Sequence, residues 1–420
     1  MGKRLSHITV FEHDCLRTDR GEQRILPDQL TALQRFYGEN GVPYFDLIHN
    51  GVKFKEYVGA LMVGNTSIEV LPKADKQLQS QAWRGVLIGM LRAVGLFDVH
   101  TPSSSFLQLR SNSILDLYFE RFVAELEYLL HRGLIKKYRR TTGNLNALKG
   151  SINFPKQIST NLTHKERFFV NYSSYDREHV FHQVLYKALR RLQRINNNVQ
   201  LQSRITSLLL DFPESQDLRI SESTFGRIVY DRKTNKYKNA MEIAKLLLLN
   251  HHPDVRVGLN DVLALMFDMN HLWERFVFAS LRKHLAHGCT ITAQNTKSFW
   301  KPATGYSSRM QPDIVINMDR DDCIVLDTKW KNLTKGNPSP HDLRQMYVYL
   351  KYYNAKHVAL VFPNADSSQQ SGLFYHESGS GLSDNSCSLI SIGVMEDIKL
   401  WQAKIADDVF RSMLTPHFQI

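Results

Sequence analysis

The sequence predicts a multidomain α+β protein. The chain has 420 residues, which is enough for two or three domains at roughly 100–200 residues each. Apolar runs bounded by turn residues dominate its beginning, apolar residues at helical spacing dominate its middle, and strands alternate with helices at its end. We therefore expect a β-rich N-terminal domain over residues 1–110, a helical region over 111–255, and a C-terminal α/β domain with a mixed sheet over 256–420.

The N-terminal domain is expected to be a compact, mostly β module. Asn-Gly and Gly-Asn steps between apolar runs favour hairpins, and a Pro-Asp step before a leucine-rich face favours the start of a helix. No set of catalytic side chains is evident in this domain. Its expected elements are a strand at Ile8–Phe11, a helix beginning at Pro27, hairpin turns at Asn50-Gly51 and Gly64-Asn65, and a helix over residues 79–94.

The middle region is expected to be mostly helical. Its first helix is capped by Ser113 and ended by Gly133, with apolar residues recurring at helical spacing between them. Further helices are expected near 177–195, 199–210 and 239–250, after an extended piece at Ser151–Phe154. Two groups of side chains resemble metal ligands, but neither is a complete set and we interpret both as structural. They are Glu178 with His179 and His182, and the pair His251-His252.

The formal charge of +12 is concentrated in the middle region. Residues 111–255 hold 23 Lys or Arg and 14 Asp or Glu, whereas residues 256–420 hold 17 and 16. The run HRGLIKKYRR (131–140) contains five basic residues and no acid. Basic runs with interleaved tyrosine suit a phosphate backbone and a stacking surface, although a solvated protein surface is the alternative. The candidate DNA-binding residues are Lys136, Lys137, Arg139 and Arg140.

The C-terminal domain is expected to follow the order α-β-β-β-α-β around a mixed sheet. A long helix over residues 260–286 is followed by a strand at Thr290–Gln294, and a Ser/Gly-rich excursion at 364–386 interrupts the later strands. The remaining expected elements are a hairpin of Pro312–Asn317 and Cys323–Lys331, a helix from Ser339 to Asn354, strands at 357–363 and 388–394, and a closing helix.

Two carboxylates and an ammonium group are expected to converge at one end of the 312–331 hairpin. Strand alternation places Asp327 and Lys329 on the same face, and Asp313 begins the neighbouring antiparallel strand. The two carboxylates and the carbonyl of Thr328 form an oxygen-ligand set suited to Mg²⁺. The metal can polarise a phosphate and acidify a water, while Lys329 orients that water or steadies developing charge. This is the constellation of PD-(D/E)xK nucleases.

The helices on either side of the hairpin supply candidate supporting residues. Glu274, on the preceding helix, can add a carboxylate to the metal site, and Gln345, on the following helix, matches a glutamine often found there in this nuclease class. Each of them can instead belong to a local polar network. The predicted catalytic residues are Asp313, Asp327, Lys329, Gln345 and Glu274, and the predicted metal ligands are Asp313, Asp327, Thr328 and Glu274.

Several classes of protein are disfavoured by what the sequence lacks. No G-x-x-x-x-G-K-[ST] motif appears, so nucleotide-driven translocation must come from a partner chain. The four cysteines lie far apart without a C-x-x-C pair, which predicts neither a zinc site nor a disulfide framework. No apolar run approaches the roughly 18 residues of a membrane span, and we expect a cytoplasmic protein with no membrane partner.

Three ordered stretches resemble the McrC family, the nuclease subunit of McrBC-type 5-methylcytosine-dependent restriction systems. They are residues 56–75 (EYVGALMVGNTSIEVLPKAD), 148–192 and 312–353. The resemblance implies a PD-(D/E)xK endonuclease core in which Asp313, Asp327 and Lys329 are catalytic. It also implies a hetero-oligomeric complex with a McrB-like AAA+ GTPase, whose hydrolysis the subunit stimulates and which recognises double-stranded DNA, methylated or unmodified. The N-terminal domain would then dock into the ring of that partner.

The sequence-based hypothesis is a Mg²⁺-dependent DNA endonuclease subunit whose basic middle region tracks the duplex. Two alternatives stay open. The first is a non-catalytic adaptor that activates the NTPase ring, which the intact acid–acid–lysine set disfavours. The second is a stand-alone, sequence-specific restriction nuclease, which the lack of an evident DNA-reading motif such as a zinc finger disfavours.

Overall fold

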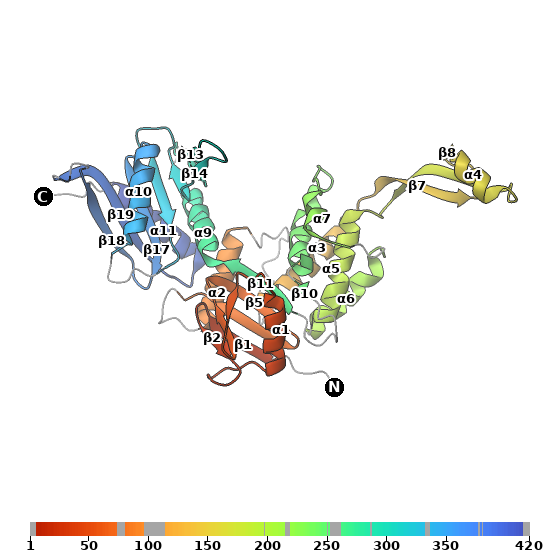
Figure 1. The fold of residues 1–420 in the computed structure, drawn as a ribbon, viewed down its shortest axis with the longest axis horizontal. Helices are drawn as coiled ribbons and strands as arrows, with labels where there is room; N and C mark the ends of the chain where they lie inside the picture. Colours follow the sequence, from red (N-terminus) through yellow and green to blue (C-terminus); the bar gives the residue numbers. More distant parts are fainter. Residues whose placement is uncertain are drawn as a thin grey trace. The chain divides into compact units, whose positions relative to one another are not determined.

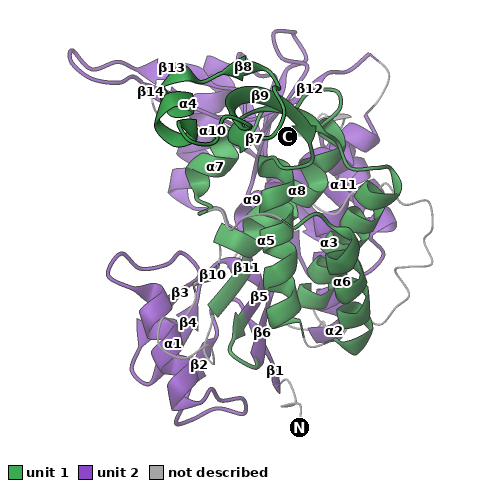
Figure 2. Ribbon diagram, turned by 90° about the vertical axis from the view of Figure 1, so that its right-hand side faces the viewer, with its two compact units in different colours: residues 1–5, 62–65, 111–265 green, residues 6–61, 66–110, 266–420 purple. Residues whose placement is uncertain are grey.

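The chain forms two compact units (Figure 2). Unit 1 is built mainly from residues 111–265, and unit 2 from residues 6–61, 66–110 and 266–420. Unit 1 contains the expected middle region, whereas unit 2 combines segments of the other two expected domains, so the boundaries at residues 110 and 255 stay predictions. The computed structural model describes residues 6–73, 80–95, 114–196, 198–214, 219–249, 251–252, 262–285, 288–331, 337–376, 379 and 381–414.

The N-terminal segments form a β-rich module, as predicted. Its elements are β1 (Ser6–Phe11), β2 (Cys15–Arg17), α1 (Pro27–Tyr37), β3 (Phe45–Ile48), β4 (Gly51–Phe54), β5 (Tyr57–Val63), β6 (Thr66–Leu71) and α2 (Ser80–Ala93). β1 runs parallel to β6, which neighbours β5, while β2, β4 and β3 form a separate antiparallel sheet. Both predicted hairpin turns are therefore confirmed.

The turn between β3 and β4 shows how local chemistry determines a hairpin. Asn50 adopts a left-handed conformation with φ of 55°, which asparagine tolerates better than most residues. At Gly51, an added Cβ would lie 2.3 Å from the carbonyl oxygen of Leu16, so only glycine lets β2 approach this closely. The Asn-Gly step thus supplies both the turn and the space for the third strand.

A six-stranded mixed sheet forms the centre of the C-terminal part of unit 2 (Figure 1). Its strands are β12 (Ile291–Ala293), β15 (Ile314–Ile316), β16 (Ile324–Thr328), β17 (His357–Asn364), β18 (Ser368–Tyr375) and β19 (Leu382–Gly393). They are ordered β12-β15-β16-β17-β19-β18. β15 is antiparallel to β16, whereas β17 is parallel to both β16 and β19, which confirms the predicted mixed sheet.

Three helices pack on this sheet. They are α9 (Met269–Lys283), α10 (Pro340–Tyr352) and α11 (Ile398–Leu414). Met346 of α10 shares a buried cluster with Leu360 of β17. On α9, Trp273 Nε1 donates a hydrogen bond to the backbone oxygen of Val361 at 3.3 Å, and its ring packs 5.6 Å from that of Trp401 on α11. Helices thus bury side chains of β17, which explains its nearly continuous apolar sequence.

The helix predicted over residues 260–286 is wrong in its first part. Residues 262–268 form strand β11 (Val262–Asp268), whose first four side chains are all buried. An uninterrupted apolar run is compatible with either a buried strand or a buried helix, and periodicity alone does not separate them. The helix begins only after Asp268, whose side chain accepts hydrogen bonds from the backbone N–H groups of Asn270 and His271.

Two hairpins in this part of the chain were not predicted. β13 (Lys297–Trp300) and β14 (Ser308–Met310) are inserted between β12 and β15. The Ser/Gly-rich excursion at 364–386 contains β18 and the beginning of β19, which pair antiparallel at one edge of the sheet. Neither segment shows a run of apolar residues alternating with polar ones, so neither gave a periodic strand signal.

Unit 1 contains a bundle of helices. They are α3 (Ile114–His131), α5 (Val180–Ile195), α6 (Val199–Asp211), α7 (Glu222–Gly226) and α8 (Lys238–Leu249), with a 3₁₀ turn η2 (Asn235–Tyr237) and the two-residue strand β10 (His251–His252). α3 and α5 each contact α6 and α8, which confirms the helical spacing predicted for these segments. No helix among the residues that the structure describes is long and apolar enough to cross a membrane.

A β-rich arm, residues 137–176, extends from the helices of unit 1 (Figure 1). It consists of β7 (Lys137–Leu145), β8 (Ser151–Ile152), α4 (Phe154–Asn161) and β9 (Phe168–Asp176). β7 and β9 pair antiparallel from Lys137↔Asp176 to Leu145↔Phe168. The expectation of a mostly helical region misses this sheet, because most side chains of β7 and β9 are exposed or half-buried and the strands present no continuous apolar face.

Candidate functional site

The paired strands β15 and β16 bring two carboxylates to one end of the sheet. Asp313 directly precedes β15, and Asp327 lies near the end of β16. Asp313 Oδ2 accepts hydrogen bonds from the backbone N–H and the hydroxyl of Thr328, at 2.6 and 2.8 Å. These two bonds hold the Asp313 carboxylate against the strand that carries Asp327.

Lys329 and Gln345 join this pair of carboxylates. Lys329 Nζ lies 2.6 Å from Asp327 Oδ2 and donates to Gln345 Oε1 at 3.4 Å. Gln345, on α10, donates from Nε2 to Asp327 Oδ1 at 3.2 Å and to the Tyr349 hydroxyl at 2.9 Å. That hydroxyl donates to the backbone oxygen of Gln311 at 3.1 Å. The helix therefore holds both the carboxylate and the ammonium group in place.

Burial perturbs the protonation of these groups. Asp327 is 2% exposed, and burial, reinforced by the charge of Asp313 and opposed by Lys329, raises the pKa of Asp327 to about 6. Burial acts to lower the pKa of Lys329, but the carboxylates of Asp327, Asp313 and Asp342 outweigh it and the pKa lies above its usual value. Lys329 is therefore protonated at neutral pH, and the buried aspartate favours a nearby positive charge.

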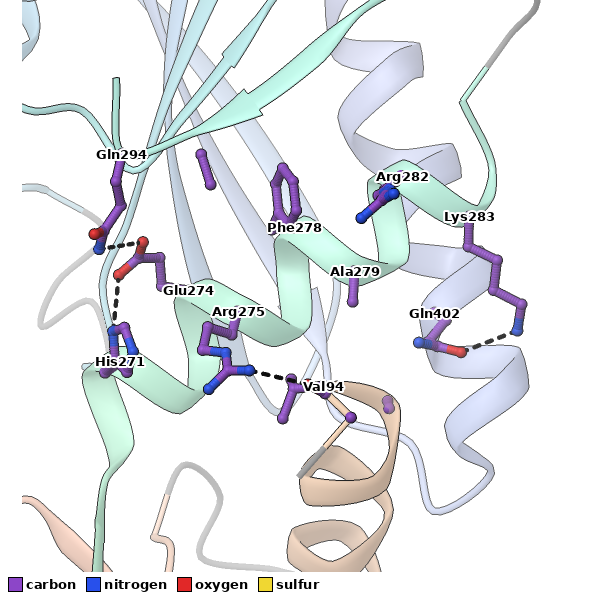
Figure 3. A pocket seen from close by; sticks show the side chains of 13 residues that line it. Val94, His271, Glu274, Arg275, Phe278, Ala279, Arg282, Lys283, Gln294 and Gln402 are labelled. Carbon is purple, nitrogen blue, oxygen red and sulfur yellow. Dashed lines mark hydrogen bonds and ion pairs between the residues drawn. The ribbon is translucent and has the colours of Figure 1, made fainter. Parts of the chain in front are cut away.

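Glu274 approaches the same region from α9 (Figure 3). Its Oε1 accepts a hydrogen bond from Gln294 Nε2 at 2.8 Å, and its Oε2 lies 3.4 Å from His271 Nδ1. Burial, together with the charge of Asp313, raises the pKa of Glu274. Gln311 Nε2 donates to Gln294 Oε1 at 3.0 Å, so a chain of two amides runs from Glu274 toward Asp313.

The chemistry of Asp313 and Asp327 fits a divalent cation. Within the described residues, no group of three or more His, Cys, Asp or Glu side chains is arranged to hold a metal ion, and the role of Glu274 as a further ligand stays a prediction. Mg²⁺ usually keeps several waters and is bound through one or two protein carboxylates. The two aspartates are therefore sufficient in number as side-chain ligands, and Glu274 contacts Gln294 and His271.

A pocket of about 950 Å³ lies along α9 and includes Glu274 (Figure 3). Arg275, Arg282 and Lys283 are among its lining residues, and Glu274 is the single acidic residue among them. The pocket therefore carries net positive charge and begins at a residue of the candidate site.

The four predicted DNA-binding residues lie at the start of the arm and not on a helix. Arg139 is paired with Asp176 at 3.2 Å and with Glu178 at 2.6 Å. Lys136 and Lys137 each lie over an aromatic ring, one on β9 and one on α5. Much of the positive charge of this run is thus already in contact with the protein's own groups.

The first histidine group lies at the base of the arm. His182 is completely buried, and its Nδ1 donates to the backbone oxygen of Arg177 at 2.6 Å while its Nε2 accepts from the Tyr237 hydroxyl at 3.1 Å. Burial lowers the pKa of His182 to about 4, so the ring is neutral. Both ring nitrogens take part in hydrogen bonds, in agreement with the structural interpretation. The side chains of His251 and His252 lie outside the described residues.

Sequence reasoning missed a buried acid next to the site. Glu12 Oε1 accepts hydrogen bonds from Trp330 Nε1 at 2.9 Å and from the backbone N–H of Lys73 at 2.6 Å. Trp330 directly follows Lys329, so the N-terminal module contacts the strand end that carries the lysine. Burial raises the pKa of Glu12. No local pattern reveals this contact, because 318 positions separate Glu12 from Trp330.

Fold and site together define a mixed α/β protein with an acid–acid–lysine cluster at the end of a mixed sheet. Residues 52–363 match the family described as McrBC 5-methylcytosine restriction system component. Because this match spans well over half of the chain, the protein belongs to that family.

Two solved assemblies from Thermococcus gammatolerans contain chains with a similar fold. A refined half-complex from a tetradecameric assembly of McrB AAA+ hexamers with bound McrC matches with a TM-score of 0.70 at 18% identity, covering 96% of this chain and 100% of that one. A cryo-EM structure of the McrBC complex matches with a TM-score of 0.51 at 21% identity, covering 67% and 88%. No curated protein matches the sequence.

Proposed function

We propose that the chain is a Mg²⁺-dependent DNA endonuclease subunit with a PD-(D/E)xK core. The observation that carries the proposal is the cluster of Asp313, Asp327 and Lys329, which Gln345 holds at the end of the sheet. The order α9, β12, β15, β16, α10, β17 supports a core of this type. Membership of a restriction-system family supports DNA as the substrate.

The side chains divide the work of phosphodiester hydrolysis. Asp313 and Asp327 hold the metal, with the carbonyl of Thr328 as a further oxygen ligand. When bound, Mg²⁺ supplies positive charge that polarises the phosphate and acidifies a water. Lys329, protonated because of the surrounding carboxylates, donates hydrogen bonds that orient the attacking water and stabilise charge developing on the phosphate. Gln345 fixes the positions of the Asp327 carboxylate and the Lys329 ammonium group through hydrogen bonds to both.

The cationic pocket along α9 supports a path for the DNA backbone beside the cut. Arg275, Arg282 and Lys283 line it, and phosphate groups bind such clusters with release of counterions. Residues 136–140 of the arm are a second proposed contact with the duplex. The paired state of Arg139 makes its contribution smaller than the charge of the run suggests.

The partner we propose is a McrB-like AAA+ GTPase. A chain of similar fold occurs in an assembly of McrB AAA+ hexamers with bound McrC. This chain carries no P-loop motif, so the nucleotide-driven motor belongs to the partner. We propose a hetero-oligomeric complex in which the N-terminal domain docks on the GTPase and stimulates its hydrolysis of GTP.

The substitution Asp327→Ala tests the assignment of the site. The purified chain is incubated with the AAA+ partner, GTP, Mg²⁺ and either methylated or unmodified plasmid. We expect the variant to lose cleavage completely and to keep stimulation of GTP hydrolysis, because the change removes a metal ligand and leaves the N-terminal domain intact. Continued cleavage by the variant would show that the site is assigned wrongly.

The same assay separates the two other functions. Cleavage by the unaltered chain without its partner would favour a stand-alone nuclease. Stimulation of GTP hydrolysis without cleavage under any condition would favour a non-catalytic adaptor. The buried pair of Asp327 and Lys329 argues against the adaptor, since an adaptor gains nothing from burying an aspartate whose pKa is raised.

A further inference from the structure

A hairpin rich in aromatic and basic residues rises from the candidate site. This aromatic hairpin, residues 297–310, is formed by β13 and β14. Gln294 shortly precedes it and Gln311 directly follows it, and the two side chains are hydrogen bonded to each other at 3.0 Å. Gln294 also donates to Glu274, and Asp313 lies two residues beyond Gln311. Both ends of the hairpin are therefore held by residues of the site.

The base of the hairpin is fixed to the end of α10. Lys297 Nζ donates to the backbone oxygen of Tyr352 at 3.3 Å and lies 4.4 Å from the centroid of the Tyr353 ring. Phe299 packs edge-on against the ring of Tyr352, with centroids 5.4 Å apart. The Tyr353 hydroxyl donates to the backbone oxygen of Asn295 at 2.7 Å. These contacts fix the base of the hairpin to the end of α10.

The hairpin presents rings and cations to solvent, with Lys301 directly after β13 and Arg309 opposite Ser298 near the base. Trp300 is 60% exposed and Tyr306 is 99% exposed. The four other tryptophans of the chain are buried, so Trp300 is an exception to the usual burial of this residue. Lys301 and Arg309 form no hydrogen bond or ion pair within the part of the chain that the structure describes. Residues 295–310 contain no Asp or Glu.

We propose that the aromatic hairpin inserts into a groove of the DNA duplex beside the cut, a proposal that rests on the nuclease function proposed above. A two-stranded β-ribbon fits the major groove of duplex DNA. Lys301 and Arg309 neutralise phosphates, and the rings of Trp300 and Tyr306 pack against bases and sugars. Because Gln294 and Gln311 join the hairpin to Glu274 and Asp313, DNA that enters the site meets the hairpin next.

The charge of the hairpin favours nucleic acid over a protein partner. Lys301 in its turn and Arg309 on β14 have no ion pair among the described residues, and the hairpin contains no acid, which complements a phosphate backbone. The position also favours DNA, since the hairpin is contiguous with the residues that are proposed to act on the scissile phosphate. The inferred role is to fix the register of the duplex relative to Asp313, Asp327 and Lys329.

Trp300 supplies its own readout, because its indole is exposed while the other four are buried. The full chain is titrated with a short duplex, with Ca²⁺ in place of Mg²⁺ to prevent cleavage, and tryptophan emission is recorded. We expect quenching and a spectral shift on DNA binding. Trp300→Phe should remove this signal and keep most of the affinity, because the phenyl ring still packs against DNA. Trp300→Ala should weaken binding about tenfold.

A matched control comes from the opposite edge of the sheet. Tyr375 lies on β18 and is 70% exposed, so Tyr375→Ala removes an exposed ring of similar size and should leave DNA affinity unchanged. Lys301→Gln combined with Arg309→Gln should lower the slope of log affinity against log salt by about 2. All these positions are on the surface, and a thermal melt checks that each variant is folded.

Two outcomes would overturn the proposal. The first is that Trp300→Ala binds DNA as tightly as the unaltered chain and that the emission of Trp300 in the unaltered chain does not change when DNA is added. The other is a Trp300 response to the AAA+ partner alone and not to DNA, which would assign the hairpin to a protein interface. Neither outcome affects the test of the nuclease site, because that test measures cleavage by Asp327→Ala. Conversely, if Asp327→Ala still cleaves DNA, the binding test of Trp300 can still be interpreted.

Discussion

The arm of unit 1 and the aromatic hairpin of unit 2 both combine basic side chains with aromatic rings, but they use them differently. In the arm, Arg139 is paired with Asp176 and Glu178, and the exposed Tyr138 packs against Tyr175 with ring centroids 4.7 Å apart. The aromatic hairpin, 297–310, exposes its tryptophan, and its Lys301 and Arg309 have no ion pair among the described residues. The number of basic residues in a segment therefore does not tell how many of them are free of contacts with the protein's own acids, because that depends on their neighbours.

The largest expected effect is on the rate of DNA cleavage, with little change in DNA affinity. Lys329→Gln should slow single-turnover cleavage roughly 100- to 1,000-fold, because it removes the charge that stabilises the reacting phosphate. DNA affinity measured with Ca²⁺ should change little, since the proposed contacts with the DNA backbone lie in the α9 pocket and the hairpin. Lys331→Gln is the matched control, because that lysine pairs with Asp342 at 2.6 Å. Equal losses in both variants would contradict the role given to Lys329.

The salt dependence of DNA binding compares the two units directly. Arg275→Gln combined with Arg282→Gln should reduce the slope of log affinity against log salt by about 2, since each phosphate contact contributes about 0.9. Neutralising Lys136, Lys137, Arg139 and Arg140 together should also flatten the slope, but by less than about 4, because Arg139 is already paired. An unchanged slope in the arm variant would assign residues 136–140 to an ordinary solvated surface.

A smaller effect is expected on stability, with a defined dependence on pH. The pKa of Asp327 is about 6 in the fold against 3.8 for a free aspartate, so the folded chain binds this proton more tightly than the unfolded chain. The resulting stabilisation is complete below the unfolded pKa and is lost as the pH rises through about 6. Asp327→Asn, which is neutral at every pH, should therefore raise the melting temperature at pH about 8 by a few degrees.

The measurement is a series of thermal melts of both chains without Mg²⁺. The gain of Asp327→Asn should shrink as the pH falls through about 6, where Asp327 itself becomes neutral. A difference in melting temperature that stays the same at every pH would contradict the raised pKa of this buried aspartate. If Asp327→Asn is more stable but does not cleave DNA, it follows the common pattern in which residues needed for function lower the stability of the fold.

Local patterns predicted those parts of the fold and the site that depend on neighbouring residues. The Asn50-Gly51 turn follows from backbone conformation, and the shared face of Asp327 and Lys329 follows from strand alternation. The pairing of Asp313 with that face required only a hairpin between two apolar runs. Each of these features is decided within about 20 residues, so the sequence alone contains the signal.

The contacts that could not be predicted join distant segments. Gln294 reaches Glu274 from another element, and Glu12 reaches Trp330 from the other end of unit 2. A polar residue in a loop gives no periodic signal that would reveal its partner. The β13–β14 hairpin was missed for a similar reason, because its rings face solvent and the usual pattern of one buried face is absent.

The hydrogen bond from Trp330 to Glu12 has a consequence for how the molecule is assembled. Contacts between residues this far apart in sequence form late, because a long loop must close before they are made. Trp330 also packs against Trp83 and Trp273, so the strand end that carries Lys329 reaches its final packing only when early and late parts of the chain have met. A fragment limited to residues 256–420 would lack Glu12 and Trp83. We expect such a fragment to fold poorly, because the strand end that carries Lys329 then lacks two of the residues that Trp330 contacts.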